Sequence, residues 1–422
     1  MPVDATKVAE PAIPRLWRPF QSLAYREFRF LWFGQFAQTS ASFGERVTRS
    51  WLAIDMTGSA FQLGALELTR GITSLILGMW GGVLADRVDK RALLMLTQTW
   101  TLACYAVMTL VALSGRLELW HLYGSAIALA LSDAVNQPVR TAFVPSLVPE
   151  NLLINALSLN SIATNATRMG APITVAALIQ ITGNGGWGYA VSAVLYVAVM
   201  VTTWLMRQVE APPAPTGSMM GSFLSGWTFI VGQRPVLTQL IIGVGPLTIG
   251  FTYQAMLVAY VKDTLGQQAA AYGALYSFAG LGALLGGLMV ASLGASARGG
   301  RMLMIAGVLN GVAMIGMGSL GLLPKTWLLF WAAVPFLMMA GGSQTSFRAA
   351  NNGLLLAATP KEMRGRVMSL DGAFRSFGTL IAPLIGALAD GANAAVAMAT
   401  IGFGSLVFVV GVLLWQPHIR KL

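Results

Sequence analysis

Cysteine, histidine and charge are all scarce in this sequence of 422 residues. Cys104 is the single cysteine, so the chain cannot close an internal disulfide. A zinc site needs three or four converging ligands, and the only histidines are His121 and His418. We therefore expect no metal site and no cofactor. The sequence also lacks a nucleotide-binding glycine loop and a serine–histidine–aspartate set, so we do not expect an enzyme.

Charged residues make up only 10% of the chain, whereas 55% of its residues are hydrophobic. A soluble protein carries about 25% charged residues, so most side chains here are expected to face lipid. The net charge of +11 does not indicate nucleic acid, because the Lys and Arg residues of membrane proteins collect on the cytoplasmic side. The first 25 residues are polar and basic, and no cleaved signal peptide is expected. The composition thus predicts an integral membrane protein whose partners include membrane lipid.

Apolar runs long enough to cross a bilayer as helices, about 20 residues each, recur along the chain. They contain many glycine and alanine residues, which allow helices to pack closely in lipid. Twelve such segments are predicted, near residues 28–54, 60–85, 92–114, 119–142, 152–182, 187–206, 236–261, 270–295, 301–322, 326–352, 366–389 and 393–415. The predicted fold is therefore an all-α integral membrane protein with twelve transmembrane helices.

The basic residues indicate how these helices are oriented. If the amino terminus lies inside, the inner segments hold 18 Lys and Arg residues and the outer loops hold 3. This asymmetry follows the positive-inside rule. We predict a multi-pass protein of the bacterial cytoplasmic (inner) membrane with both termini in the cytoplasm.

A polar, proline-rich stretch at residues 208–221 divides the chain into two halves. We predict an N-terminal six-helix bundle with a cytoplasmic tail over residues 1–207, a cytoplasmic linker over 208–234 and a C-terminal six-helix bundle over 235–422. Residues 222–233 of the linker are predicted either as a helix on the inner membrane surface or as a plain loop.

The two halves share sequence at a constant spacing. Pro149 and Pro172 recur as Pro360 and Pro383, each 211 residues later, which is half of the chain length. Two pseudo-symmetric six-helix repeats are typical of secondary transporters, which hold substrate near the bilayer midplane between the halves. We expect a monomer that moves a small molecule.

A dense cluster of charges interrupts the apolar sequence at GGVLADRVDKRALL, residues 81–94. Its candidate gate residues are Gly82, Asp86, Arg87, Lys90 and Arg91. Their order resembles the loop between spans 2 and 3 of the major facilitator superfamily, with Asp89 in place of the second glycine. The stretches FRFLWFGQF, TGSAFQLGAL, NQPVRTAFVPSLVP and RGRVMSL resemble the branch of that superfamily that contains enterobactin exporters and macrolide efflux proteins.

The resemblance implies that Asp86 contacts the start of the span near residues 365–370, where a helix N-terminus favours a carboxylate. Such a contact would join the two halves and act as an inner gate. Arg140, near the inner end of its span, is a further gate candidate. The alternative for these residues is that they set the topology and extend their side chains to the lipid headgroups.

Charged residues inside the predicted spans are candidates for proton coupling, because an ionisable group is costly within lipid. Glu45 and Arg49 lie four residues apart, and Glu67 and Arg70 lie three apart, so each pair shares a helix face. These four side chains are expected to meet in the outer half of a cavity. Glu45, Glu67 and Asp133 are the predicted proton carriers, and the alternative is a static set of salt bridges between spans 1 and 2.

Polar, cationic and aromatic side chains within the spans predict a substrate cavity. Its candidate residues are Arg49, Arg70, Gln38, Asn165, Arg168, Tyr253, Gln254, Arg348, Asp371 and Arg375. The alternative for the polar ones is hydrogen bonding between helices. We predict a secondary active transporter that exports small amphiphilic molecules, such as drugs or siderophores, by proton-coupled antiport. An uptake symporter or a lysophospholipid transporter on the same fold is the alternative.

Overall fold

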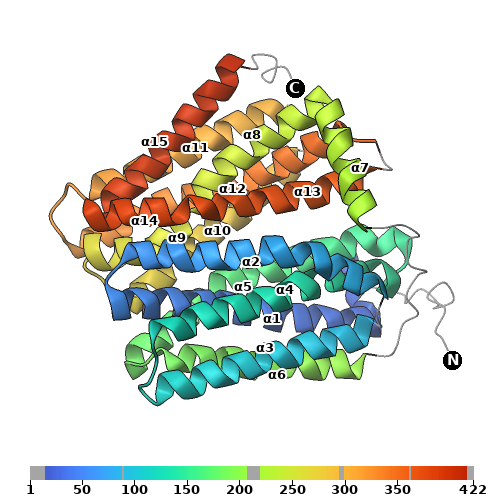
Figure 1. Cartoon of the computed structure of the whole chain (residues 1–422), viewed down its shortest axis with the longest axis horizontal. Coiled ribbons are helices and arrows are strands. Elements are labelled where there is room, and N and C mark those ends of the chain that lie inside the picture. The colour runs from blue at the N-terminus through green and yellow to red at the C-terminus, as the bar shows by residue number, and fades with distance from the viewer. Residues whose placement is uncertain (1–14, 88–89, 207–218, 294–298, 361–362, 416–422) are drawn as a thin grey trace. The chain divides into compact units, whose positions relative to one another are not determined.

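The computed structural model describes residues 15–87, 90–206, 219–293, 299–360 and 363–415, and within these ranges it contains helices and no strand (Figure 1). The first half holds η2 (Arg15–Ala24), α1 (Arg26–Thr57), α2 (Ala60–Arg87), α3 (Lys90–Leu113), α4 (Leu119–Leu147), η3 (Glu150–Leu152), α5 (Leu153–Thr182) and α6 (Gly186–Leu205). The second half holds α7 (Met219–Gly232), α8 (Arg234–Phe251), α9 (Tyr253–Ala259), η4 (Tyr260–Thr264), α10 (Ala269–Leu293), α11 (Gly299–Leu320), α12 (Trp327–Ala357), α13 (Arg364–Ser376), η7 (Phe377–Leu380), α14 (Ala382–Gly391) and α15 (Ala394–Trp415). Each of the twelve predicted segments coincides with helix, so the all-α class is confirmed.

Six of the described helices, α3, α6, α10, α11, α12 and α15, are long and apolar enough to cross a membrane. The helices α1, α2, α4 and α5 contain 32, 28, 29 and 30 residues. At about 1.5 Å per residue each of them exceeds the roughly 30 Å thickness of the hydrocarbon layer. Their sequences mix polar residues such as Glu45, Arg49 and Asn136 with the apolar ones. The arrangement of twelve spans in two bundles stays a prediction.

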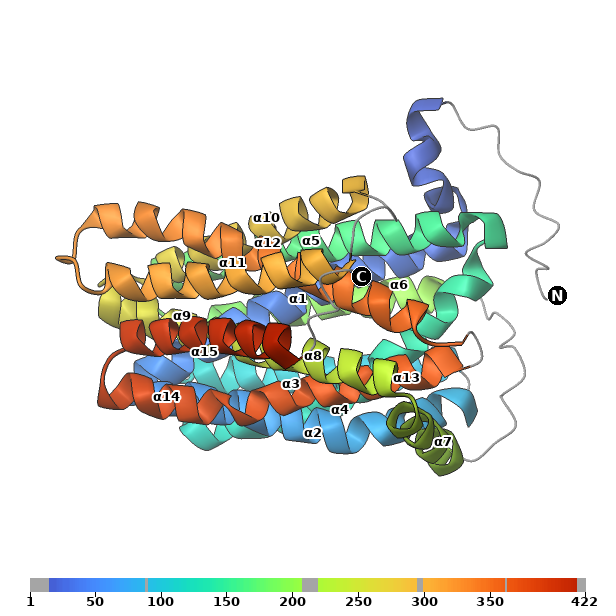
Figure 2. The ribbon, with the colours of Figure 1, turned by 90° about the horizontal axis from the view of Figure 1, so that it is seen from above.

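Two of the predicted spans are interrupted rather than continuous. The segment at 236–261 is divided into α8, α9 and the π-helical turn η4. The segment at 366–389 is divided into α13, the 3-10 turn η7 and α14, and Pro383 lies in the first turn of α14. Proline has no N–H group, so it is tolerated at a helix start and breaks a helix interior. Figures 1 and 2 show that α13 and α14 lie end to end and run in nearly the same direction.

The chain divides into two compact units, and the predicted domain boundaries stay a prediction. Unit 1 comprises Met1–Thr48 and Thr73–Thr216, whereas unit 2 comprises Arg49–Ile72 and Gly217–Leu422. The end of α1 and the start of α2 therefore belong to unit 2, because this hairpin (residues 49–72) packs on α14 through contacts given below. Unit 2 also includes residues 217–234.

The interior of unit 1 is built where α3 packs against α6 and α4. The rings of Tyr105 and Tyr196 meet edge to face with their centroids 5.3 Å apart. The indole nitrogen of Trp32 on α1 donates a hydrogen bond of 2.9 Å to the carbonyl oxygen of Leu159 on α5. These contacts join helices that are distant in sequence and give unit 1 its own core.

In unit 2, α12 packs between α10 and α11, and α11 also packs against α15. The helix α7 packs on α13, where the rings of Trp227 and Phe374 lie 5.8 Å apart. Arg366 Nη1 donates to the hydroxyl of Ser225 at 2.9 Å. The segment at 222–233 is thus a helix attached to unit 2, and the plain loop is excluded.

Candidate functional site

An ion pair joins α1 to α2 inside unit 2. Arg49 Nη2 donates to Glu67 Oε1 at 2.9 Å, and the side chain of Arg49 is 1% exposed whereas that of Glu67 is 26% exposed. A buried charge is unfavourable unless it is paired, and a bond between two charged groups is stronger than a neutral one. The structure therefore brings Arg49 and Glu67 into direct contact. Glu45 is fully buried one helical turn before Arg49, and Arg70 is half-buried on α2.

The start of α2 is bound by a carboxylate from a helix far along the chain. Asp390 on α14 accepts hydrogen bonds from the backbone N–H of Ala60 at 2.5 Å and of Phe61 at 3.0 Å. The hydroxyl of Ser59 donates to the same carboxylate at 2.6 Å. The first N–H groups of a helix have no partner within it, and the positive end of the helix dipole favours an anion. Asp390, which lies on α14, supplies both the hydrogen-bond acceptor and the negative charge.

Glycines allow α2 and α14 to touch at the backbone. A Cβ atom on Gly64 would collide with the carbonyl oxygen of Ala382, and one on Gly386 would collide with that of Ala60. Two turns further along α2, a Cβ atom on Gly71 would collide with the side chain of Thr379. The hairpin is therefore held against α14 by close packing as well as by the hydrogen bonds to Asp390.

A second charged contact holds the hairpin to η4. Lys262 Nζ lies 3.1 Å from Asp55 Oδ1 and 5.9 Å from the centre of the Trp51 ring. The ion pair is exposed, so its contribution is about 0–1 kcal/mol.

Sequence reasoning missed Asp390, Asp55 and Lys262. Ser59 is a typical helix-capping residue, so the start of α2 could be read from the sequence. Nothing near Asp390 in the sequence indicates that it caps the start of a helix 330 residues earlier. Only the packing of α14 on the hairpin shows this.

In unit 1 the predicted cavity residue Gln38 lies in a buried network between helices. Its Nε2 atom donates to Asn136 Oδ1 at 3.3 Å, and Asn136 Nδ2 donates to the hydroxyl of Thr97 at 3.1 Å. Gln38 is 1% exposed, which favours the alternative of an interhelical hydrogen bond. The predicted proton carrier Asp133 is half-buried on the same helix as Asn136.

The predicted gate residue Arg140 is buried on α4 in unit 1. Its Nη1 atom donates to Gln35 Oε1 at 3.3 Å and to the carbonyl oxygen of Leu31 at 3.5 Å, both on α1. The side chain of Arg140 is thus buried between helices of unit 1, and its role as a gate stays a prediction. Of the predicted cavity residues of α5, Asn165 is half-buried and bonds locally to the carbonyl oxygen of Ser161 at 2.9 Å. The other, Arg168, is also half-buried.

The predicted cavity residues of unit 2 differ widely in exposure. Tyr253 is 1% exposed and Asp371 is fully buried, whereas Arg348 is exposed on α12. Gln254 Oε1 accepts a hydrogen bond of 3.2 Å from the hydroxyl of Tyr276 on α10. This contact ties α9 to α10 and places an amide and a phenol at the point where the predicted seventh span breaks.

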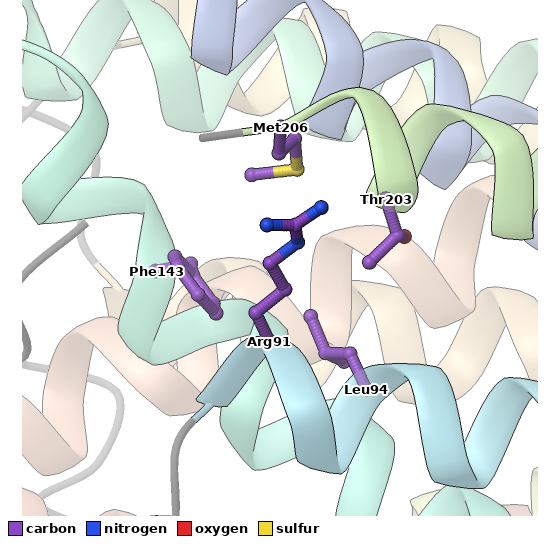
Figure 3. A pocket seen from close by; sticks show the side chains of 5 residues that line it. All are labelled: Arg91, Leu94, Phe143, Thr203 and Met206. Carbon is purple, nitrogen blue, oxygen red and sulfur yellow. The ribbon is translucent and has the colours of Figure 1, made fainter. Parts of the chain in front are cut away.

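Arg91 is the one residue of the predicted gate cluster whose side chain is described. Figure 3 shows its guanidinium among Leu94 of α3, Phe143 of α4, and Thr203 and Met206 at the end of α6. It donates to the carbonyl oxygen of Trp204 in the last turn of α6. A cation at a helix C-terminus is favourable, so Arg91 fastens α3 to α6 within unit 1.

The side chains of Asp86, Arg87, Lys90 and Arg375 and the surroundings of Gly82 lie outside the described part of the structure, and the roles of these residues stay predictions. Within the described ranges, no group of three His, Cys, Asp or Glu residues is placed to hold a metal ion.

Helices of membrane length that carry a buried ion pair, together with internal repeats and broken helices, are typical of membrane transporters. The sequence matches the transmembrane secretion effector family over residues 17–422. The chain belongs to this family, within the major facilitator superfamily, and it is a membrane transporter.

The relatives agree with this assignment. The chain is 27% identical to the enterobactin exporter EntS of Escherichia coli O139:H28 over 369 residues, which cover 87% of this chain and 86% of that protein. It is equally similar to EntS of Shigella boydii serotype 18 over 367 residues. In fold it resembles the nucleoside transporter NupG, with a TM-score of 0.77, 10% identity and coverage of 92% and 100% of the two chains. It also resembles the POT family transporter PepTSo, with a TM-score of 0.75, 14% identity and coverage of 94% and 99%.

Proposed function

We propose that the chain exports small amphiphilic molecules across the bacterial inner membrane by alternating access, driven by proton antiport. The observation that carries this proposal is the Arg49–Glu67 ion pair, a carboxylate that is partly accessible beside an arginine that is buried. An ionisable pair within helices of membrane length is a functional site by default. The direction of transport is supported by the relatives that are named enterobactin exporters.

Glu67 is better placed than Glu45 to exchange protons. Glu45 is fully buried, whereas the Glu67 side chain is 26% exposed, so protons can reach it without rearrangement of its surroundings. A deprotonated Glu67 accepts hydrogen bonds from the donors of a substrate with both of its oxygens, and protonation removes its charge and turns one of these acceptors into a donor. Proton and substrate then compete for one carboxylate, which is what antiport requires.

The same pair also permits the alternative, a symporter. An anionic substrate that pairs with Arg49 displaces the Glu67 carboxylate, and protonation of Glu67 favours this displacement. Proton and substrate would then move together. The sign of the coupled proton flux separates the two functions.

Alternating access further requires contacts that open and close. We assign the outer closure to the hairpin at residues 49–72, which is held to α14 by Asp390 and to η4 by Lys262. The inner gate is assigned to Asp86, with the termini on the cytoplasmic side and the chain acting as a monomer. These assignments rest on the resemblance to the superfamily and on the distribution of basic residues.

The experiment is a proton-flux measurement in liposomes that contain the purified chain and an internal pH-sensitive dye. Addition of a siderophore or drug-like substrate on one side is expected to drive protons toward the side from which the substrate leaves. Glu67→Gln is expected to abolish the substrate-dependent flux. Glu150→Gln, a change at an exposed residue of η3, serves as the matched control and is expected to retain it. Proton flux in the direction of the substrate would overturn antiport and leave the symporter.

A further inference from the structure

A groove of about 550 Å³ lies within unit 2, where α12 forms the floor between α10 and α11. The groove exists because two residues of α10, Gly282 and Gly286, lack side chains where this helix meets α12. A Cβ atom on Gly282 would collide with the carbonyl oxygen of Met338, and one on Gly286 would collide with the backbone of Gly342. The two helices therefore touch at the backbone and leave room above the contact.

The walls of the groove are apolar and open outward. Leu285 and Met289 on α10 are 50% and 52% exposed, and Ile305 on α11 is 59% exposed. The opposite face of α11, which carries Leu303 and Met314, is buried against its neighbours. Exposed apolar walls on helices of membrane length face lipid, so the groove opens toward the acyl chains.

The hydroxyl groups of the floor already donate hydrogen bonds to backbone carbonyl oxygens, so they add little polarity to the groove. The hydroxyl of Ser343 donates to the carbonyl oxygen of Ala340 at 3.0 Å, and that of Ser346 donates to the carbonyl oxygen of Gly286 at 3.4 Å. Methionine side chains, which are flexible and adapt to irregular shapes, line much of the remainder. They are Met289, Met302, Met338 and Met339. The lining therefore suits a flexible hydrocarbon chain.

Arg301 closes one end of the groove. It is the third residue of α11, and its side chain is exposed. From Arg301 to Leu309, the far end of the lining on this helix, the rise is about 12 Å. One leaflet of the hydrocarbon layer is about 15 Å deep. The groove thus runs from the headgroup level, where an arginine side chain extends toward water, to near the midplane.

We propose that this groove binds one acyl chain of an anionic phospholipid whose phosphate contacts Arg301. The length of the groove fits one leaflet, its lining fits a hydrocarbon chain, and its single charged lining residue fits a phosphate. The site is separate from the Arg49–Glu67 pair and does not depend on what the protein transports.

The test is native mass spectrometry of the purified full chain with phosphatidylglycerol, phosphatidylcholine or inorganic phosphate added. Phosphatidylglycerol is expected to bind about fivefold tighter than phosphatidylcholine, the effect of one arginine near an anionic headgroup. Arg301→Gln is expected to remove this preference, and Ile305→Trp, which fills the groove, is expected to weaken binding of both lipids. Arg234→Gln and Val308→Trp change exposed residues outside the lining and are expected to leave binding unaltered.

Three results would overturn the proposal. The first is an unchanged lipid preference in Arg301→Gln. The second is competition by inorganic phosphate alone, which would indicate an anion site without a chain. The third is a dimer that Ile305→Trp abolishes, which would assign the face to a second copy of the chain. Equal melting temperatures of the two groove variants and their controls would show that the changes leave the fold intact.

Discussion

Asp390 on α14 caps the helix that begins at Ala60, so one carboxylate fastens the first hairpin of the chain to its penultimate helix. The bond from the Ala60 N–H to Asp390 Oδ1 is 2.5 Å long, and the two residues are 330 positions apart. Carboxylates at helix starts are common, but they usually come from the same segment. Here the cap is supplied by α14, so the helix start is stabilised only while the two helices remain in contact.

Asp390→Ala is expected to loosen the start of α2. Loss of a capping side chain costs about 0.5–2 kcal/mol, so hydrogen exchange at residues 60–63 is expected to rise by about 2- to 30-fold. Asn393→Ala is the matched control, because Asn393 Oδ1 caps α15 locally by accepting a hydrogen bond from the Val396 N–H. Unchanged exchange at residues 60–63 in the Asp390 variant would show that the cap is not needed there.

Gly64→Ala is expected to destabilise the protein by forcing α2 away from the backbone of Ala382. Gly170→Ala, in open space on α5, is expected to act in the opposite direction, because alanine is favoured over glycine in a helix by about 0.5–1 kcal/mol. Melting temperatures of the two variants in the same detergent check this. Equal shifts in both would contradict close packing of α2 on α14.

Glu67→Gln is expected to lower stability by about 1–3 kcal/mol, because it takes the carboxylate partner from the buried Arg49. The double variant Arg49→Gln/Glu67→Gln is expected to be less destabilised than the sum of the two single variants. A double-mutant cycle of unfolding free energies measures the coupling. Strict additivity would mean that the two side chains do not stabilise each other.

Asp86→Asn is expected to reduce transport strongly while expression and melting temperature stay near those of the natural protein. The physical reason is that a carboxylate at the inner gate would hold one conformation through its charge, which asparagine lacks. Asp89→Asn, in the same charged cluster, is the control and is expected to transport normally. Transport at the natural rate by purified Asp86→Asn would refute the gate.

The sequence alone was sufficient to predict the positions of the helices and the superfamily of this protein. Apolar runs of bilayer length predicted the positions of the helices, since a helix in lipid must satisfy its backbone within itself. The charge cluster at residues 81–94 and stretches such as RGRVMSL predicted the superfamily, which the family match confirmed. Glu67 and Arg49 were also found in this way, because charges stand out in an apolar sequence.

Other features were decided only by the tertiary structure. Pro383 does not show by itself that the eleventh predicted span divides into α13, η7 and α14, because proline also occurs inside kinked helices. The sequence shows neither that Arg49 pairs with Glu67 nor that Asp390 accepts a hydrogen bond from the Ala60 N–H. A local pattern sets where a helix can begin, but the partner of a buried charge or a helix end depends on which helices pack together. That packing follows from backbone contacts such as those of Gly64 and Gly386, and these appear only when the chain is folded.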